Sequence, residues 1–247
     1  MKKILKWGAI SLLAIILLGA AGFVVWAENA LGPEQVALDA LKSDNTVTVT
    51  EKAGYTSFTP VGAQPTSGFI FYPGGRVDYR SYAPVLRKIA AQGYMVVLVP
   101  VRLNLAFFDI NAAEPVLKDF PTIQHWAIGG HSLGGVAAAI FANSHPQIDG
   151  IVFWASYPGD DSLKDSNLKI MSIYATRDGL ASRSKIDASR ALLPSGTIFV
   201  PIEGGDHAQF GAYGPQPGDN PANIPAEAQW QQTADATSKL LQMLASH

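Results

Sequence analysis

Short apolar runs alternate along this chain with segments in which apolar residues recur at helical spacing. The runs Tyr94–Val99 and Ile148–Trp154 are typical of strands covered on both faces, whereas the spacing within Tyr82–Gln92 predicts a helix. The other strands that the pattern predicts are Thr46–Glu51, Tyr55–Pro60, Gly68–Tyr72, Trp126–Gly129, Lys169–Ala175 and Thr197–Pro201. Because strands and helices alternate from Gly68 onward, the sequence predicts a mostly parallel sheet with helices on both faces.

The N-terminus carries a long uncharged apolar segment. Three lysines precede the stretch from Trp7 to Ala27, which at roughly 21 residues is long enough to cross a bilayer as a helix. The lysines at positions 2, 3 and 6 favour a cytoplasmic N-terminus, which places the chain after Glu28 outside the cytoplasm. We expect an uncleaved membrane anchor; since Val25-Trp26-Ala27 also fits a signal-peptidase site, secretion after cleavage is the alternative.

Composition narrows the classes of function. The 247 residues include 48% hydrophobic ones, enough for a globular domain with a sizeable core. A formal net charge of -2 gives no electrostatic reason to expect a nucleic acid as partner. The chain contains no cysteine, which excludes a disulfide framework, a thiolate nucleophile and cysteine metal ligands.

The strongest motif is Gly130-His131-Ser132-Leu133-Gly134, a G-x-S-x-G sequence. It follows the predicted strand Trp126–Gly129 and precedes a helix of small residues that begins near Val136. Such a sharp turn between strand and helix exposes the serine hydroxyl above the sheet, and its glycines let strand and helix pass closely. The motif predicts that Ser132 is a nucleophile.

A serine nucleophile needs a neighbouring base to take its proton. Of the five histidines, His207 follows the last predicted strand directly, and catalytic groups of open α/β sheets lie beyond the carboxyl ends of their strands. The other four are less suited to this role. His247 is terminal and His145 lies at a helix end, where capping explains it. His125 begins the strand before the motif, at the wrong end of the sheet, and His131 is fixed beside Ser132 by the turn. His207 is therefore the predicted general base.

The carboxylate that orients this base is predicted to be Asp178, just past the strand Lys169–Ala175. The order Ser132, Asp178, His207 is one in which such triads occur. Asp206 is the rival because it adjoins His207, and Asp160 and Asp161 are weaker rivals after the preceding strand.

The transition state of acyl transfer needs backbone N–H donors for its oxyanion. Leu133 supplies one by following the nucleophile, and Gly75 in the loop Pro73-Gly74-Gly75-Arg76 is the first choice for the second, with Arg76 as the next choice. Residues expected to contact substrate near the strand ends are Arg76, Trp154, Tyr157 and Phe210.

These motifs resemble those of the α/β-hydrolase fold superfamily. The segments 71–78 and 203–218 are similar to the bacterial group called α/β-hydrolase fold-5, which is related to the dienelactone hydrolases. The resemblance implies a mainly parallel eight-stranded sheet and hydrolysis through an acyl-enzyme. The chain departs from the superfamily by having Tyr72-Pro73 where His-Gly is frequent, and from true dienelactone hydrolases by having Ser132 where they use cysteine.

The sequence thus predicts a membrane-tethered serine hydrolase of carboxylic esters, with a small ester-like molecule as substrate. A peptidase, thioesterase or lipase would use the same residues, and a binding or sensing module that has lost turnover is the alternative of another class. No phosphate loop, metal-ligand motif or dinucleotide fingerprint occurs, so we expect no cofactor and no metal. The parts are residues 1–27 as membrane anchor or signal segment, 28–67 as N-terminal helix and leading strands, and 68–247 as the α/β-hydrolase catalytic core.

Overall fold

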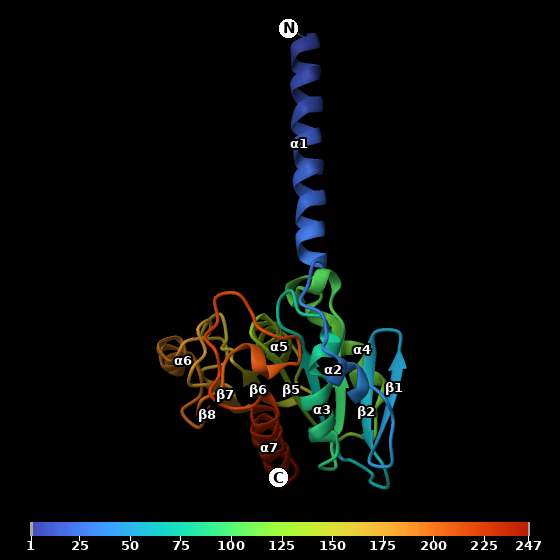
Figure 1. Ribbon diagram of the computed structural model, residues 1–247, viewed down its shortest axis with the longest axis vertical. Coiled ribbons are helices and arrows are strands. Elements are labelled where there is room, and N and C mark those ends of the chain that lie inside the picture. Colours follow the sequence, from blue (N-terminus) through green and yellow to red (C-terminus); the bar gives the residue numbers. More distant parts are fainter. Residues whose placement is uncertain (1, 247) are drawn as a thin grey trace.

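An eight-stranded sheet runs through the protein in the computed structural model, which describes residues 2–246 (Figure 1). Its strand order is β1-β2-β4-β3-β5-β6-β7-β8, and β2 alone runs antiparallel to its neighbours. The strands are β1 Val47–Lys52, β2 Tyr55–Pro60, β3 Ser67–Tyr72, β4 Met95–Leu98, β5 His125–His131, β6 Ile148–Trp154, β7 Lys169–Ala175 and β8 Ile198–Ile202. The predicted mostly parallel sheet is confirmed.

Helices cover both faces of the sheet, as the sequence predicts. The helices are α1 Lys2–Glu28, α2 Gln35–Ala40, α3 Ala83–Ala90, α4 Glu114–Asp119, α5 Leu133–Ser144, α6 Arg183–Ser189 and α7 Ala226–Ala245, of which α1 lies apart from the sheet. Alternate side chains of β3 point to opposite faces, so Phe69 and Phe71 join the core under α3 and α7, whereas Ile70 and Tyr72 join the core under α5. These two buried layers hold the sheet in place and with it the carboxyl ends of its parallel strands, where the candidate site lies.

The segment Val101–Gln124, within which the sequence predicts only a helix near Ala112–Phe120, forms no strand. It holds three short 3₁₀ turns, Arg102–Asn104, Ala106–Phe108 and Ile110–Ala113, followed by α4. Leu103 and Asn104 have positive φ angles of 56° and 51°, which interrupt any regular helix there. This segment packs beside the carboxyl ends of the strands.

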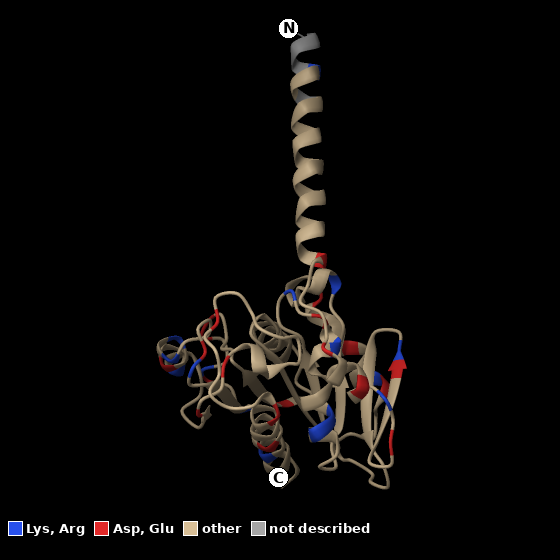
Figure 2. Ribbon diagram, viewed as in Figure 1, with Lys and Arg blue, Asp and Glu red and all other residues tan. Residues whose placement is uncertain are grey.

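Helix α1 projects from the domain (Figure 1). Its stretch Lys6–Glu28 has a mean hydropathy of 2.5 and no buried residues within its most apolar window, so it is long and apolar enough to cross a membrane or to act as a signal sequence. Figure 2 shows charged residues in the domain and at the end of α1 that joins it, and the sequence has no charged residue from Trp7 to Ala27.

The carboxyl ends of the strands lie on the side of the domain from which α1 rises. The arrow of β1 points toward α1 (Figure 1), and the pairing requires every other strand except β2 to run the same way. The site at these strand ends therefore faces the foot of α1.

Candidate active site

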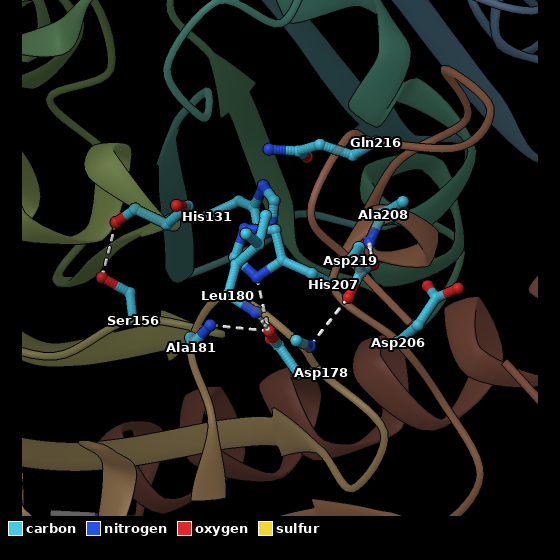
Figure 3. Close-up of polar contacts among 12 residues, drawn as sticks. His131, Ser156, Asp178, Leu180, Ala181, Asp206, His207, Ala208, Gln216 and Asp219 are labelled. Carbon is cyan, nitrogen blue, oxygen red and sulfur yellow. Dashed lines mark hydrogen bonds and ion pairs between the residues drawn. The ribbon is translucent and has the colours of Figure 1, made fainter. Parts of the chain in front are cut away.

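Ser132 occupies the turn between β5 and α5 and has the backbone angles φ 50° and ψ −118°. Few non-glycine residues adopt such a conformation, and the strain is held by the surrounding turn. Added Cβ atoms at Gly130 and Gly134 would overlap backbone atoms, so strand and helix pass as closely as the motif requires. The Ser156 hydroxyl donates to the carbonyl oxygen of Ser132 at 2.6 Å and braces the turn (Figure 3).

Asp178 and His207 meet above the ends of β7 and β8. Oδ2 of Asp178 lies 2.7 Å from Nδ1 of His207, and both side chains are almost completely buried (Figure 3). The other oxygen, Oδ1, accepts hydrogen bonds from the backbone N–H groups of Leu180 at 2.7 Å and Ala181 at 2.6 Å. These donors fix the carboxylate, which in turn fixes the imidazole ring.

A cavity of about 230 Å³ brings the third residue to the pair. Ser132 and His207 both line it, together with Leu133, Val136, Ala155, Ser156, Tyr157, Leu180 and Ala181. Nε2 of His207 is buried and has no hydrogen-bond partner within residues 2–246. The structure therefore brings Ser132 and His207 to one small, largely apolar cavity, and Asp178 contacts His207 behind that lining.

The rival carboxylates have other partners. Oδ1 of Asp206 accepts from the Gln209 N–H at 2.8 Å, and Oδ2 accepts from the Ala222 N–H at 3.1 Å. This side chain therefore stabilises its own loop and takes no part in the contact between His207 and Asp178 (Figure 3). Burial raises the pKa of Asp206 above its ordinary value. Asp160 and Asp161 are exposed, and Asp160 accepts from the N–H of Ser162.

Asp219 is a residue that the sequence reasoning missed. Its Oδ2 accepts from the Ala208 N–H at 2.9 Å, and its Oδ1 accepts from the Gly179 N–H at 2.9 Å. One carboxylate thus joins the residue after Asp178 to the residue after His207. The sequence placed Asp219 in a long loop rich in glycine and proline, and no local motif distinguishes it there.

The loop after β3 lies against the elbow. A Cβ atom added to Gly75 would be 3.1 Å from Cδ2 of Leu133, which places the two residues predicted to bind an oxyanion side by side. The N–H of Arg76, the second choice as donor, donates instead to the carbonyl oxygen of Asn104 at 2.8 Å. That bond makes Gly75 the better candidate.

Three of the four residues expected to contact substrate lie elsewhere. Trp154 and Phe210 are fully buried in the core and do not line the cavity. The Arg76 guanidinium donates to the carbonyl oxygens of Trp26 at 2.9 Å and Asn29 at 2.8 Å and stacks on the Trp26 ring, so it is committed to the foot of α1. Only Tyr157 lines the cavity.

His131, the residue before Ser132, is buried beside the predicted base. Its ring centroid lies 4.4 Å from that of His207, and its ring also stacks on Phe210. Burial, and then the neighbouring His207, lower the pKa of His131 well below 6.5. His131 is therefore neutral at pH 7 and packs against the ring of His207 without lining the cavity.

Within residues 2–246, no cluster of three or more histidine, aspartate or glutamate side chains is arranged to hold a metal ion. The cavity holds a hydroxyl and an imidazole, and a carboxylate contacts that imidazole; these are the groups that nucleophilic catalysis uses.

Two solved structures are similar in fold over most of their length. A predicted CIB-like hydrolase from Thermoplasma acidophilum aligns with a TM-score of 0.56 and 15% identity, over 78% of this chain and 99% of that one. The esterase domain of a Rhodothermus marinus protein aligns with a TM-score of 0.56 and 14% identity, over 79% of this chain and 97% of that one. A comparison with curated protein sequences gives no match.

A model of the alpha/beta hydrolase family matches residues 68–231, which is more than half of the chain and includes the elbow, Asp178 and His207. The chain therefore belongs to the alpha/beta hydrolase family, and it is a hydrolase.

Proposed function

We propose that this protein is a serine hydrolase that cleaves carboxylic esters through an acyl-enzyme. The single observation that carries the proposal is the 2.7 Å contact between His207 Nδ1 and Asp178 Oδ2, with Ser132 and the unpartnered Nε2 of His207 at one cavity. A buried carboxylate that accepts from Nδ1 leaves Nε2 as the proton acceptor, which is the form a general base needs.

In the proposed reaction, Oγ of Ser132 attacks the ester carbonyl carbon while Nε2 of His207 takes the hydroxyl proton. Asp178 stabilises the resulting imidazolium. As the tetrahedral intermediate collapses, the bond to the alcohol breaks and His207 returns the proton to the departing oxygen. Water, deprotonated by His207, then attacks the acyl carbon; as the bond to Ser132 Oγ breaks and the acid leaves, His207 returns the proton to Oγ.

The oxyanion of each tetrahedral intermediate is assigned to the N–H groups of Leu133 and Gly75. Leu133 opens α5, so its N–H has no carbonyl acceptor within the helix. The close packing of Gly75 on Leu133 supports convergence of the two donors, each worth on the order of 3 kcal/mol in the transition state.

The size of the cavity favours a small acyl group. At about 230 Å³ it is smaller than the roughly 300–1,000 Å³ typical of sites for drug-sized ligands. The lining is mostly apolar, from Leu133, Val136, Leu180 and Ala181. We therefore assign a short acyl chain to this cavity and leave the alcohol part of the ester outside it.

We further propose that α1 is retained as a membrane anchor with the catalytic domain outside the cytoplasm. Lysines at positions 2, 3 and 6 precede the apolar stretch and favour a cytoplasmic N-terminus. Cleavage after Ala27 would instead release a secreted enzyme. Immunoblotting of membrane and soluble fractions, with protease protection of intact cells, distinguishes these outcomes.

The test is hydrolysis of p-nitrophenyl esters from acetate to palmitate by the full chain in detergent, beside its Ser132→Ala variant. We expect turnover with a short-chain optimum, its loss in the variant, and fluorophosphonate labelling only of the wild type. Labelling that persists in Ser132→Ala would mean another nucleophile. A folded protein that neither turns over nor labels would support the binding module in place of the enzyme.

A further inference from the structure

The catalytic domain is joined to α1 without a flexible stalk. Ala27, at the end of the apolar stretch, is completely buried, and Leu31 forms a β-bridge with Val77 just beyond the loop of Gly75. The Leu31 N–H donates to the carbonyl oxygen of Arg76 at 2.8 Å. The chain that leaves α1 therefore pairs at once with the loop beside the proposed nucleophile.

Side chains strengthen this junction from the site outward. The guanidinium of Arg76, adjacent to Gly75, binds the carbonyl oxygens of Trp26 and Asn29 and lies 4.4 Å from the centre of the Trp26 ring. Asn104 accepts from the Arg76 N–H and donates to the Ala27 carbonyl at 3.4 Å. These contacts hold α1 in a fixed position near the carboxyl ends of the parallel strands (Figure 1), the end of the sheet at which Ser132 and His207 lie.

Two exposed aromatic residues lie at the same junction. Phe107 and Phe108 each have 48% of their surface exposed, and the Phe108 ring packs edge-on against Phe23 with centroids 5.9 Å apart. Arg102 fixes their loop by donating to the Phe108 carbonyl at 2.6 Å and to Asp109 at 2.9 Å. Their exposure is therefore a property of an ordered turn.

The depth of these residues follows from helix geometry. Trp26 is a residue type enriched at the membrane interface, and Phe23 lies three residues, about 4.5 Å along the helix axis, further into the apolar stretch. Since Phe108 contacts Phe23, Phe108 reaches the same depth when α1 spans a bilayer. The surface formed by Phe107 and Phe108 is continuous with that of the spanning helix.

We propose that the domain lies against the membrane through Phe107 and Phe108, and that the ester is carried on an amphiphile held in that membrane. This rests on the proposed esterase activity and on a retained α1. The small cavity takes the short acyl group, while the apolar part of the alcohol stays in the bilayer that the strand ends face.

Membrane contact is tested with single labels, because the chain has no native cysteine. Phe108→Cys and Val61→Cys carry the same environment-sensitive fluorophore, in the full chain reconstituted in phosphatidylcholine vesicles. Val61 is the matched control, because it is 51% exposed and follows β2, whose antiparallel direction places it at the opposite end of the sheet from the site. We expect blue-shifted emission and quenching by spin-labelled lipid at position 108 only. Equal solvent exposure at both positions would overturn the proposal.

The substrate class is tested by comparing dioleoylglycerol acetate in the vesicles with soluble triacetin, measuring released acetate. We expect Phe107→Ser with Phe108→Ser to slow hydrolysis of the vesicle ester several-fold and to change triacetin hydrolysis less than two-fold, with Val61→Ser unchanged on both. Wild type that cleaves triacetin but not the vesicle ester, or an equal loss on both esters, would contradict membrane presentation. Absence of any Ser132-dependent hydrolysis would instead contradict the proposed esterase activity.

Discussion

The hydroxyl of Tyr82 lies 2.9 Å from Nδ1 of His131, the residue that precedes the proposed nucleophile. The same hydroxyl accepts a hydrogen bond from the Gly74 N–H at 3.0 Å. In the tautomer of His131 that carries its proton on Nε2, Nδ1 accepts the single hydroxyl proton of Tyr82. One buried side chain therefore joins the loop of Gly75 to the elbow of Ser132.

Replacing Tyr82 by phenylalanine removes both of these hydrogen bonds. Tyr82→Phe leaves the Gly74 N–H and His131 Nδ1 buried without a partner, so we expect a loss of about 1–3 kcal/mol in unfolding free energy and a lower kcat. Urea unfolding and ester kinetics measure the two effects. Tyr213→Phe, which loses only the contact with Gln216, is the control, and equal effects of both changes would contradict this role.

The buried neutral His131 makes stability depend on pH. Its pKa is held well below 6.5 in the folded protein, so below pH 6.5 the unfolded chain binds a proton that the folded one does not. Stability is therefore full above pH 6.5 and falls as the pH decreases, by up to about 1.4 kcal/mol for each pH unit. Unfolding of wild type and His131→Asn at pH 7.5 and about 5 measures this; a constant difference between them would contradict it.

Asp178→Asn tests the assignment of the carboxylate. The two backbone N–H groups that bind Oδ1 would retain the amide oxygen, which turns the amide NH₂ toward His207 Nδ1. His207 would then carry its proton on Nε2 and could not act as a base, so we expect kcat to fall by about 10⁴-fold with little change in fold. Asp206→Asn is the matched comparison, and the larger loss in that variant would reverse the assignment.

Asp219 is expected to act by positioning the two catalytic loops. Asp219→Ala removes the acceptor for both Gly179 and Ala208, and displacement of Asp178 and His207 should lower kcat by about 10–10²-fold while KM changes little. Asp160→Ala, at an exposed loop position, should leave both constants unchanged. A loss confined to the melting temperature, with kcat intact, would assign Asp219 to stability alone.

The strained backbone of Ser132 should appear as a difference between two inactive variants. Alanine retains a Cβ atom at φ 50°, whereas glycine accepts these angles without that penalty. After allowing for the greater freedom of glycine in the unfolded chain, we expect Ser132→Gly to exceed Ser132→Ala in unfolding free energy by about 1 kcal/mol. Chemical denaturation compares them, and a less stable glycine variant would refute stored strain.

The sequence by itself determined the elements and their order. The buried strand β4 lies within the continuous apolar run that predicts it, because a strand covered on both faces needs apolar residues at every position. The motif around Ser132 is likewise local, since its glycines and small residues are needed by the turn itself. Asp178 and His207 were predictable because both follow strands directly, and parallel strands end at one edge.

Only the tertiary structure decided what each side chain near that edge contacts. Arg76, Trp154, Tyr157 and Phe210 all lie at or after strand ends, yet of these four only Tyr157 lines the cavity. Asp219 contacts both the loop of Asp178 and the loop of His207 through a segment whose sequence has no periodicity. The docking of Phe108 on Phe23 likewise joins residues far apart in the chain. Such contacts depend on packing between distant segments, and local patterns along the sequence carry no information about that packing.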